Sequence, residues 1–137
     1  MQGSNNKAIG DLNGMIGNEN FFSGNQNLAV GNFNQLFGNN NQLLGNQNII
    51  NGQNNFNLGN LNYYQGNGNQ GLGNSNGIIG NNNLFQGNFN AVIGDSNIIS
   101  GQGNSVVGSQ NGVNGINNLL IGQNTFLSGA GNVSVGK

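Results

Sequence analysis

Gly31-Asn32-Phe33-Asn34-Gln35-Leu36-Phe37-Gly38-Asn39-Asn40-Asn41-Gln42-Leu43-Leu44-Gly45 contains two copies of one seven-residue unit, and the whole chain repeats this unit. Glycine recurs at every seventh position from Gly3 to Gly136, which gives 19 complete units in one unbroken register. Counted from the glycine, the unit reads G-N-x-N-x-Φ-x, where Φ is an apolar residue. Such a strict period predicts a repeat architecture, and it has to be identified before any shorter motif is interpreted.

The residue types of the unit exclude a helix and predict β-strands. A glycine at every seventh residue would cost a helix roughly 1 kcal/mol per glycine, so a heptad coiled coil is excluded. In an extended segment the fourth and sixth positions lie on one face, and the fifth and seventh lie on the other. The fourth position is Asn in 18 of 19 units, and the sixth is apolar in 16 of 19, with the exceptions Thr125 (fourth position) and Asn57, Gly71 and Ser134 (sixth position). We therefore expect these two positions to face inward.

The expected fold is all-β, a parallel β-solenoid or β-roll that forms a single domain over residues 1–137. Its coils should stack about 4.8 Å apart, so that like residues lie over like residues. A coil of two units (14 residues) would enclose a thin core, and a coil of three units (21 residues) would form a triangle. The recurring Ala and Val at the sixth position favour two units, because a triangular core would hold larger side chains. We expect the opening glycine and the Asn that follows it to make each bend, since both types reach left-handed conformations at low cost.

The fourth position predicts an asparagine ladder inside the solenoid. A buried Asn must satisfy both ends of its amide, and a stack of identical Asn side chains can do so from coil to coil and with the turn backbone. This ladder is expected to include Asn20, Asn27, Asn34, Asn41, Asn48, Asn62, Asn83, Asn90 and Asn97.

The composition argues against several classes of function. The chain has two Lys or Arg, three Asp or Glu, no His and no Cys, and its net charge is −1. It therefore lacks a basic stripe for nucleic acid and a polybasic face for anionic lipid. No window is long and apolar enough for membrane insertion, and the N-terminus does not read as a signal peptide. With neither His nor Cys nor a carboxylate cluster, no metal ligand set, cofactor site or catalytic group is predicted.

Two short motifs arise by chance from the repeat. Gly66-Asn67-Gly68-Asn69-Gln70-Gly71 matches the G-x-G-x-x-G dinucleotide pattern, but no buried strand precedes it and no helix can follow it. Gly73-Asn74-Ser75-Asn76-Gly77 matches the nucleophile elbow, yet a chain without His offers Ser75 no base. Asn-Gly steps such as Asn51-Gly52 resemble hairpin turns, but a hairpin would reverse the chain and break the stack. We expect an enzyme function to be absent.

Two of the units resemble repeats of known proteins. Gly101-Gln102-Gly103-Asn104-Ser105-Val106-Val107-Gly108 and Gly87-Asn88-Phe89-Asn90-Ala91-Val92-Ile93-Gly94 look like the repeat of left-handed β-rolls in grass ice-binding (ice recrystallisation inhibition) proteins. They are also similar to the heads of trimeric bacterial adhesins. The resemblance covers nearly the whole chain, but it is a simple repeat and implies fold more than function. The grass proteins place Thr on outward positions, whereas Thr125 is the only Thr here and lies in the inward row.

The outward positions carry the main functional signal. The fifth, the seventh or both are apolar in 18 of 19 units, although they should face water. A triangular or irregular coil would hide some of these side chains. We expect instead that they form an assembly surface. This surface is expected to include Phe21, Phe37, Ile49, Tyr63, Leu84, Ile98, Leu119 and Phe126.

Two functional hypotheses follow. The first is a structural protein that partners with itself, forming head-to-tail solenoid filaments or fibrils through uncapped ends and apolar outward rows. The alternative is an ice-binding or surface-adhesion module whose flat face meets ice or another repetitive surface. The sequence leaves the compartment open and favours an extracellular or surface-associated one.

Overall fold

The computed structural model describes residues 1–136 and consists of two parallel β-sheets, with no helix in that range. Sheet B contains the ten odd-numbered strands: β1 Lys7–Ile9, β3 Phe21–Ser23, β5 Gln35–Phe37, β7 Ile49–Asn51, β9 Tyr63–Gln65, β11 Gly77–Ile79, β13 Ala91–Ile93, β15 Ser105–Val107, β17 Leu119–Ile121 and β19 Val133–Val135. Sheet A contains the nine even-numbered strands: β2 Gly14–Ile16, β4 Leu28–Val30, β6 Gln42–Leu44, β8 Phe56–Leu58, β10 Gln70–Leu72, β12 Leu84–Gln86, β14 Ile98–Gln102, β16 Gly112–Ile116 and β18 Phe126–Ala130.

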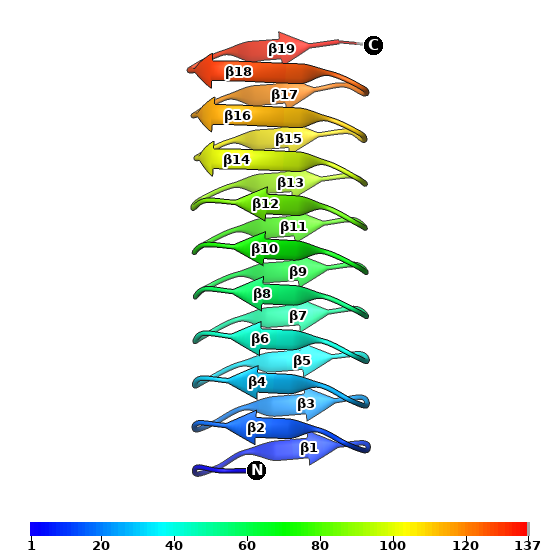
Figure 1. Cartoon of the computed structure of the whole chain (residues 1–137), viewed down its shortest axis with the longest axis vertical. Helices are drawn as coiled ribbons and strands as arrows, with labels where there is room; N and C mark the ends of the chain where they lie inside the picture. The colour runs from blue at the N-terminus through cyan, green and yellow to red at the C-terminus, as the bar shows by residue number, and fades with distance from the viewer. Residues whose placement is uncertain (137) are drawn as a thin grey trace.

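The two sheets form one continuous β-solenoid, in which each coil contributes one strand to each sheet (Figure 1). Every pairing is parallel and joins residues 14 apart, as in Gln35 with Ile49. The predicted coil of two units is therefore confirmed, and a hairpin at the Asn-Gly steps is excluded. Strands of the two sheets run in opposite directions, so their carboxyl ends lie at opposite edges of the solenoid (Figure 1).

The core is a single file of sixth-position side chains between the two sheets. The fully buried apolar residues of this file are Met15, Phe22, Ala29, Leu36, Leu43, Ile50, Tyr64, Ile78, Phe85, Val92, Ile99, Val106, Val113 and Leu120. The fourth-position Asn residues flank this file, and those from Asn20 to Asn118 are buried as well, whereas Asn6, Asn13 and Asn132 are half-buried. The inward and outward assignment of the four strand positions is therefore as the sequence predicts.

The bends differ from the prediction in one respect. The opening glycines do have positive φ, as at Gly45 with φ 145°. The second left-handed residue, however, is the third position of the unit and not the Asn at the second position. Side chains as different as those of Leu12, Glu19 and Phe33 take φ values of 57° to 59° there. The backbone N–H of this residue donates to the second-position carbonyl of the preceding coil, as Phe33 does to Asn18 at 3.0 Å, which stabilises a conformation that these residue types rarely adopt.

The polar and missing side chains in the middle of the core compensate for each other. The hydroxyl of Tyr64, in sheet B, donates to Oδ1 of Asn57, in sheet A, at 2.7 Å. A Cβ on Gly71, the next core residue of sheet A, would overlap with the ring of Phe85 and with the hydroxyl of Tyr64. The rings of Tyr64 and Phe85 pack edge to face with centroids 5.2 Å apart. The glycine thus leaves the space that the two large rings need, and the strand register continues through this region unchanged.

Candidate functional site: asparagine ladders and outward faces

The inner asparagine ladder joins each coil to its neighbours by side-chain and backbone hydrogen bonds. Nδ2 of Asn34 donates to Oδ1 of Asn20 at 3.0 Å and to the carbonyl of Gly45 at 2.8 Å. Oδ1 of Asn34 accepts from both the backbone N–H and Nδ2 of Asn48, at 3.0 and 3.1 Å. The amide is therefore fully satisfied without water. All nine Asn residues predicted for this ladder are buried at the fourth position.

A second ladder, which the sequence pattern did not lead us to expect, runs along the exposed bend. Oδ1 of Asn32 accepts from the backbone N–H and Nδ2 of Asn18, at 2.8 and 3.1 Å, and Nδ2 of Asn32 donates to Asn46 at 3.1 Å. The same pattern continues coil by coil to Asn88. On the opposite edge Asp95 takes the place of an Asn, accepting from Nδ2 of Asn81 at 3.0 Å. The second-position Asn residues therefore hold neighbouring coils together, which explains their recurrence.

The residues predicted to form an assembly surface all point outward, but they lie on two different faces. Phe21, Ile49, Tyr63 and Leu119 belong to sheet B, and Phe37 lies beside Phe21 with ring centroids 5.7 Å apart. The other members, Leu84, Ile98 and Phe126, lie on sheet A. Phe21, Phe37 and Leu119 are half-buried, and the rest are exposed. The predicted set is thus divided between the faces and does not form one patch.

The structure reveals two continuous aliphatic rows at the seventh position. We call ridge A the row on sheet A, and it consists of Ile16, Val30, Leu44, Leu58 and Leu72. We call ridge B the row on sheet B, and it consists of Ile79, Ile93, Val107, Ile121 and Val135. Every member of both ridges is at least one-third exposed. Each ridge occupies five successive strands of its sheet, and a search of the sequence at a spacing of 14 would have found both.

A row of small side chains lies beside ridge B on the same sheet. Gly77, Ala91 and Ser105 are the fifth-position residues of three successive strands, β11, β13 and β15. A Cβ built on Gly77 would meet no atom within 4 Å. We call this row the trough. Beside ridge A the fifth position holds mostly larger residues, Leu28, Gln42, Phe56 and Gln70, so sheet A has no equivalent row of small side chains there.

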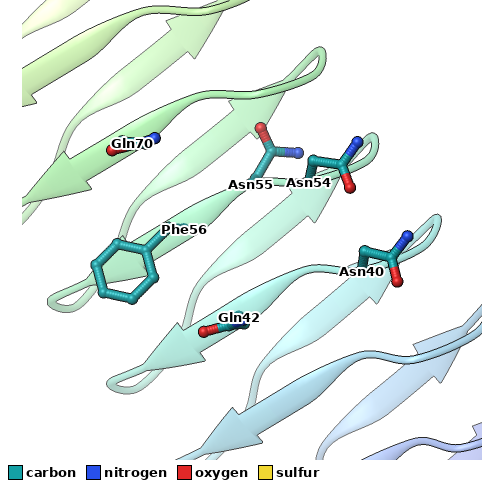
Figure 2. A pocket seen from close by; sticks show the side chains of 6 residues that line it. All are labelled: Asn40, Gln42, Asn54, Asn55, Phe56 and Gln70. Carbon is teal, nitrogen blue, oxygen red and sulfur yellow. The ribbon is translucent and has the colours of Figure 1, made fainter.

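Sheet A carries a shallow, open groove of about 570 Å³ around Phe56. Figure 2 shows the ring of Phe56 between the side chains of Gln42 and Gln70, on neighbouring strands, with Asn40 and Asn54 at the preceding bends. The lining holds amides and one aromatic ring but no titratable group. Such a surface can form hydrogen bonds and stack on an apolar face, but its lining supplies neither an acid nor a base.

The described residues offer neither a metal centre nor a membrane-spanning helix. Among residues 1–136, no three His, Cys, Asp or Glu side chains come together as metal ligands would. Nor does any helix in that part of the chain have the length and apolarity to cross a membrane. The dinucleotide-like motif at residues 66–71 forms a bend that leads into strand β10. Ser75, of the elbow-like motif, lies in a bend with φ 58°.

No family model matches this chain, and no curated protein is similar to it. The resemblance to grass ice-binding proteins and adhesin heads therefore stays an interpretation of the repeat. The class that the fold itself defines is a two-sheet parallel β-solenoid stabilised by asparagine ladders.

Proposed function

We propose that the chain is a structural protein that associates with copies of itself into filaments or fibrils. The observation that carries this proposal is the pair of exposed aliphatic rows, ridge A and ridge B, on the outer faces of the two sheets. Five adjacent aliphatic side chains in a straight row form an apolar stripe of a kind that soluble monomers seldom expose. The side chains are held by the strand register, so little conformational entropy is lost when they are covered.

The charge of the chain supports the same proposal. A net charge of −1 over 137 residues provides almost no repulsion between copies. Of the outward side chains of both sheets, only Lys7 is charged, because Asp11, Glu19 and Asp95 lie at the bends. Two sheets can therefore approach face to face without burying unpaired charges over most of their length.

Head-to-tail stacking along the solenoid axis is part of the proposal. Within residues 1–136, strands β1 and β19 each have a neighbour on one side only. A second copy that continued the same 14-residue register would extend both sheets and both asparagine ladders. The apolar rows would then join such stacks sideways.

The test is the concentration dependence of the molecular mass. Sedimentation velocity from low to high micromolar concentration should show a rise above the 14.2 kDa of one chain, and electron micrographs of concentrated samples should show filaments or fibrils. A variant with Leu44→Lys and Ile93→Lys should associate much less. The matched control, Gln47→Lys with Gln110→Lys, adds the same two charges at exposed bends outside both sheets and should behave like the parent. A parent chain that stays monomeric throughout this range would overturn the proposal.

The second candidate, binding to ice or another repetitive surface, is favoured by the outer ladder. Asn18 to Asn88 form a straight row of amides on one edge, with one amide per coil and fixed orientation. Such a row could match a surface with a repeat near the coil spacing of about 4.8 Å. Inhibition of ice recrystallisation by the monomeric protein, abolished by Asn46→Lys, would support this candidate. Equal activity of the parent and the variant would exclude the outer ladder as the binding face.

A further inference from the structure

The face of sheet B is complementary to itself in shape. Ridge B and the trough lie side by side on the same strands, with Ile79 next to Gly77, Ile93 next to Ala91 and Val107 next to Ser105. Residues two apart in a strand are separated by about 6.6 Å along it. A tall row and a low row of equal pitch therefore run parallel to the solenoid axis.

We infer that two copies of this chain pair through sheet B, related by a twofold axis parallel to the solenoid axis. This inference rests on the proposed self-association and identifies sheet B as the interface that forms first. Rotation about such an axis exchanges the two edges of the sheet and keeps each coil at its own height. Over strands β11 to β15, ridge B of each copy then enters the trough of the other, so that Ile93 lies over Ala91 of the second copy and Ala91 lies under its Ile93. The last two members of ridge B, Ile121 and Val135, face the fifth-position Leu119 and Val133 instead.

Other pairings of the same faces fit less well. A twofold axis along the strands would place ridge B on ridge B with its order reversed, which leaves both troughs empty. Placing ridge A in the trough would bring ridge B against the tall fifth-position row of sheet A, which includes Leu28 and Phe56. Pairing sheet A with itself offers no trough beside ridge A. Of the pairings that use an aliphatic ridge, the axial twofold pairing of sheet B is the one that places small side chains opposite tall ones in both directions.

The available area is sufficient for a stable dimer. Ten strands spaced about 4.8 Å apart make a face about 48 Å long, and about five residues of each coil give it a width of about 16 Å. The face therefore covers about 750 Å² per copy, close to the roughly 800 Å² per partner of a typical stable interface. Ridge B supplies the apolar centre of its C-terminal half, and the mixed N-terminal half leaves its one charge, Lys7, in the end coil.

This pairing leaves ridge A on the outer face of both copies. The dimer would therefore present an exposed aliphatic row on each side, through which further dimers could join. Ridge A has large residues such as Leu28 and Phe56 beside it and no trough, so this second contact would be the weaker one. Dimerisation through sheet B should accordingly precede larger assembly as the concentration rises.

A charge-swap experiment tests the facing of Ile93 and Ala91. The variants Ile93→Lys and Ala91→Glu both change outward-facing residues, and each should keep the circular dichroism spectrum of the parent. Each variant alone should sediment as a monomer at concentrations where the parent is a dimer, because a self-pair would bury two like charges. An equimolar mixture of the two should restore a species of twice the 14.2 kDa chain mass, since it combines one Lys–Glu contact with one unchanged contact. The control Leu44→Lys, on ridge A, should keep the dimer.

Each result decides between the inference and the broader proposal. If the parent associates and both sheet B variants associate equally well, the inference is wrong and self-association stands. If the parent is monomeric, both are wrong. Failure of the mixture to pair would overturn the facing geometry. Because the chain has no Cys, a mixture of Ser105→Cys and Val107→Cys chains gives an independent measurement: oxidation should link the two variants to each other faster than either to itself, and equal rates would contradict the twofold pairing.

Discussion

Replacing Asn34 by Leu should destabilise the solenoid by about 2 to 4 kcal/mol. The substitution removes four side-chain hydrogen bonds of Asn34, two that Nδ2 donates and two that Oδ1 accepts. Nδ2 of Asn48 keeps two other acceptors, so its loss is small. The backbone N–H of Asn48 and the carbonyl of Gly45 lose this partner, and each such buried group costs about 1 to 3 kcal/mol, which the apolar surface of Leu offsets only in part.

The assay is urea-induced unfolding followed by circular dichroism, with Asn32→Leu as the matched control. Asn32 belongs to the same unit and also takes part in a ladder, but its bonds lie at the exposed bend. Water can replace them there, so the control should lose less than about 1 kcal/mol. Equal losses at Asn32 and Asn34 would show that burial does not set the contribution of the ladder, and the reasoning would fail.

Three further changes test other parts of the fold, each by the free energy of unfolding in urea. Gly45→Ala should cost about 3 kcal/mol or more, because its φ of 145° is strained for Ala and its Cβ would overlap with the carbonyl of Gly59; a loss below about 1 kcal/mol would contradict this close approach of neighbouring coils. Gly71→Ala should cost about 1 to 3 kcal/mol, and Phe85→Leu in the same chain should recover part of it by making room, whereas purely additive losses would argue against a shared space. Burial raises the pKa of Tyr64 well above its usual value, so above about pH 10 only the unfolded chain releases this proton. Stability should then fall by up to about 1.4 kcal/mol per pH unit as pH rises from about 10 towards the folded-state pKa, and Tyr64→Phe should reduce that slope.

The period of seven was sufficient to predict the all-β solenoid and the inward Asn and apolar positions, and the small Ala and Val side chains at the sixth position favoured the coil of two units. These features follow from the alternation of side chains in strands and from the stacking of identical units. The left-handed third position could not be predicted, because residues such as Leu12 and Phe33 do not ordinarily favour positive φ. There the geometry of the bend and its hydrogen bonds to the preceding coil override the preference of the residue.

Apolar outward rows were predicted, but their division into one ridge on each sheet was not, and neither was the core compensation. Counting apolar residues unit by unit mixes the two faces, and it gave the divided set that includes Phe37 and Leu84. Rows appear only when residues are grouped every 14 positions on one sheet. In the core, the missing side chain of Gly71 makes room for the large side chains of Tyr64 and Phe85, which come from different sheets. This fit depends on contacts across the core and cannot be read from a local sequence pattern.

The two asparagine ladders align side-chain amide dipoles along the solenoid axis. In the inner ladder most Asn side chains donate from Nδ2 to the Oδ1 of the preceding coil, as Asn34 does to Asn20, while in the outer ladder Nδ2 donates to the Oδ1 of the following coil, as Asn32 does to Asn46. The aligned amide dipoles of the two rows are therefore opposed. The outer row ends at Asn88 on its edge, because Gln102 and Ile116 occupy the same position in the next two coils. In the last coils the inner amide dipoles are therefore no longer opposed by an outer row on that edge. A rod with almost no net charge is thus polarised along its axis, and the two directions along that axis are not equivalent.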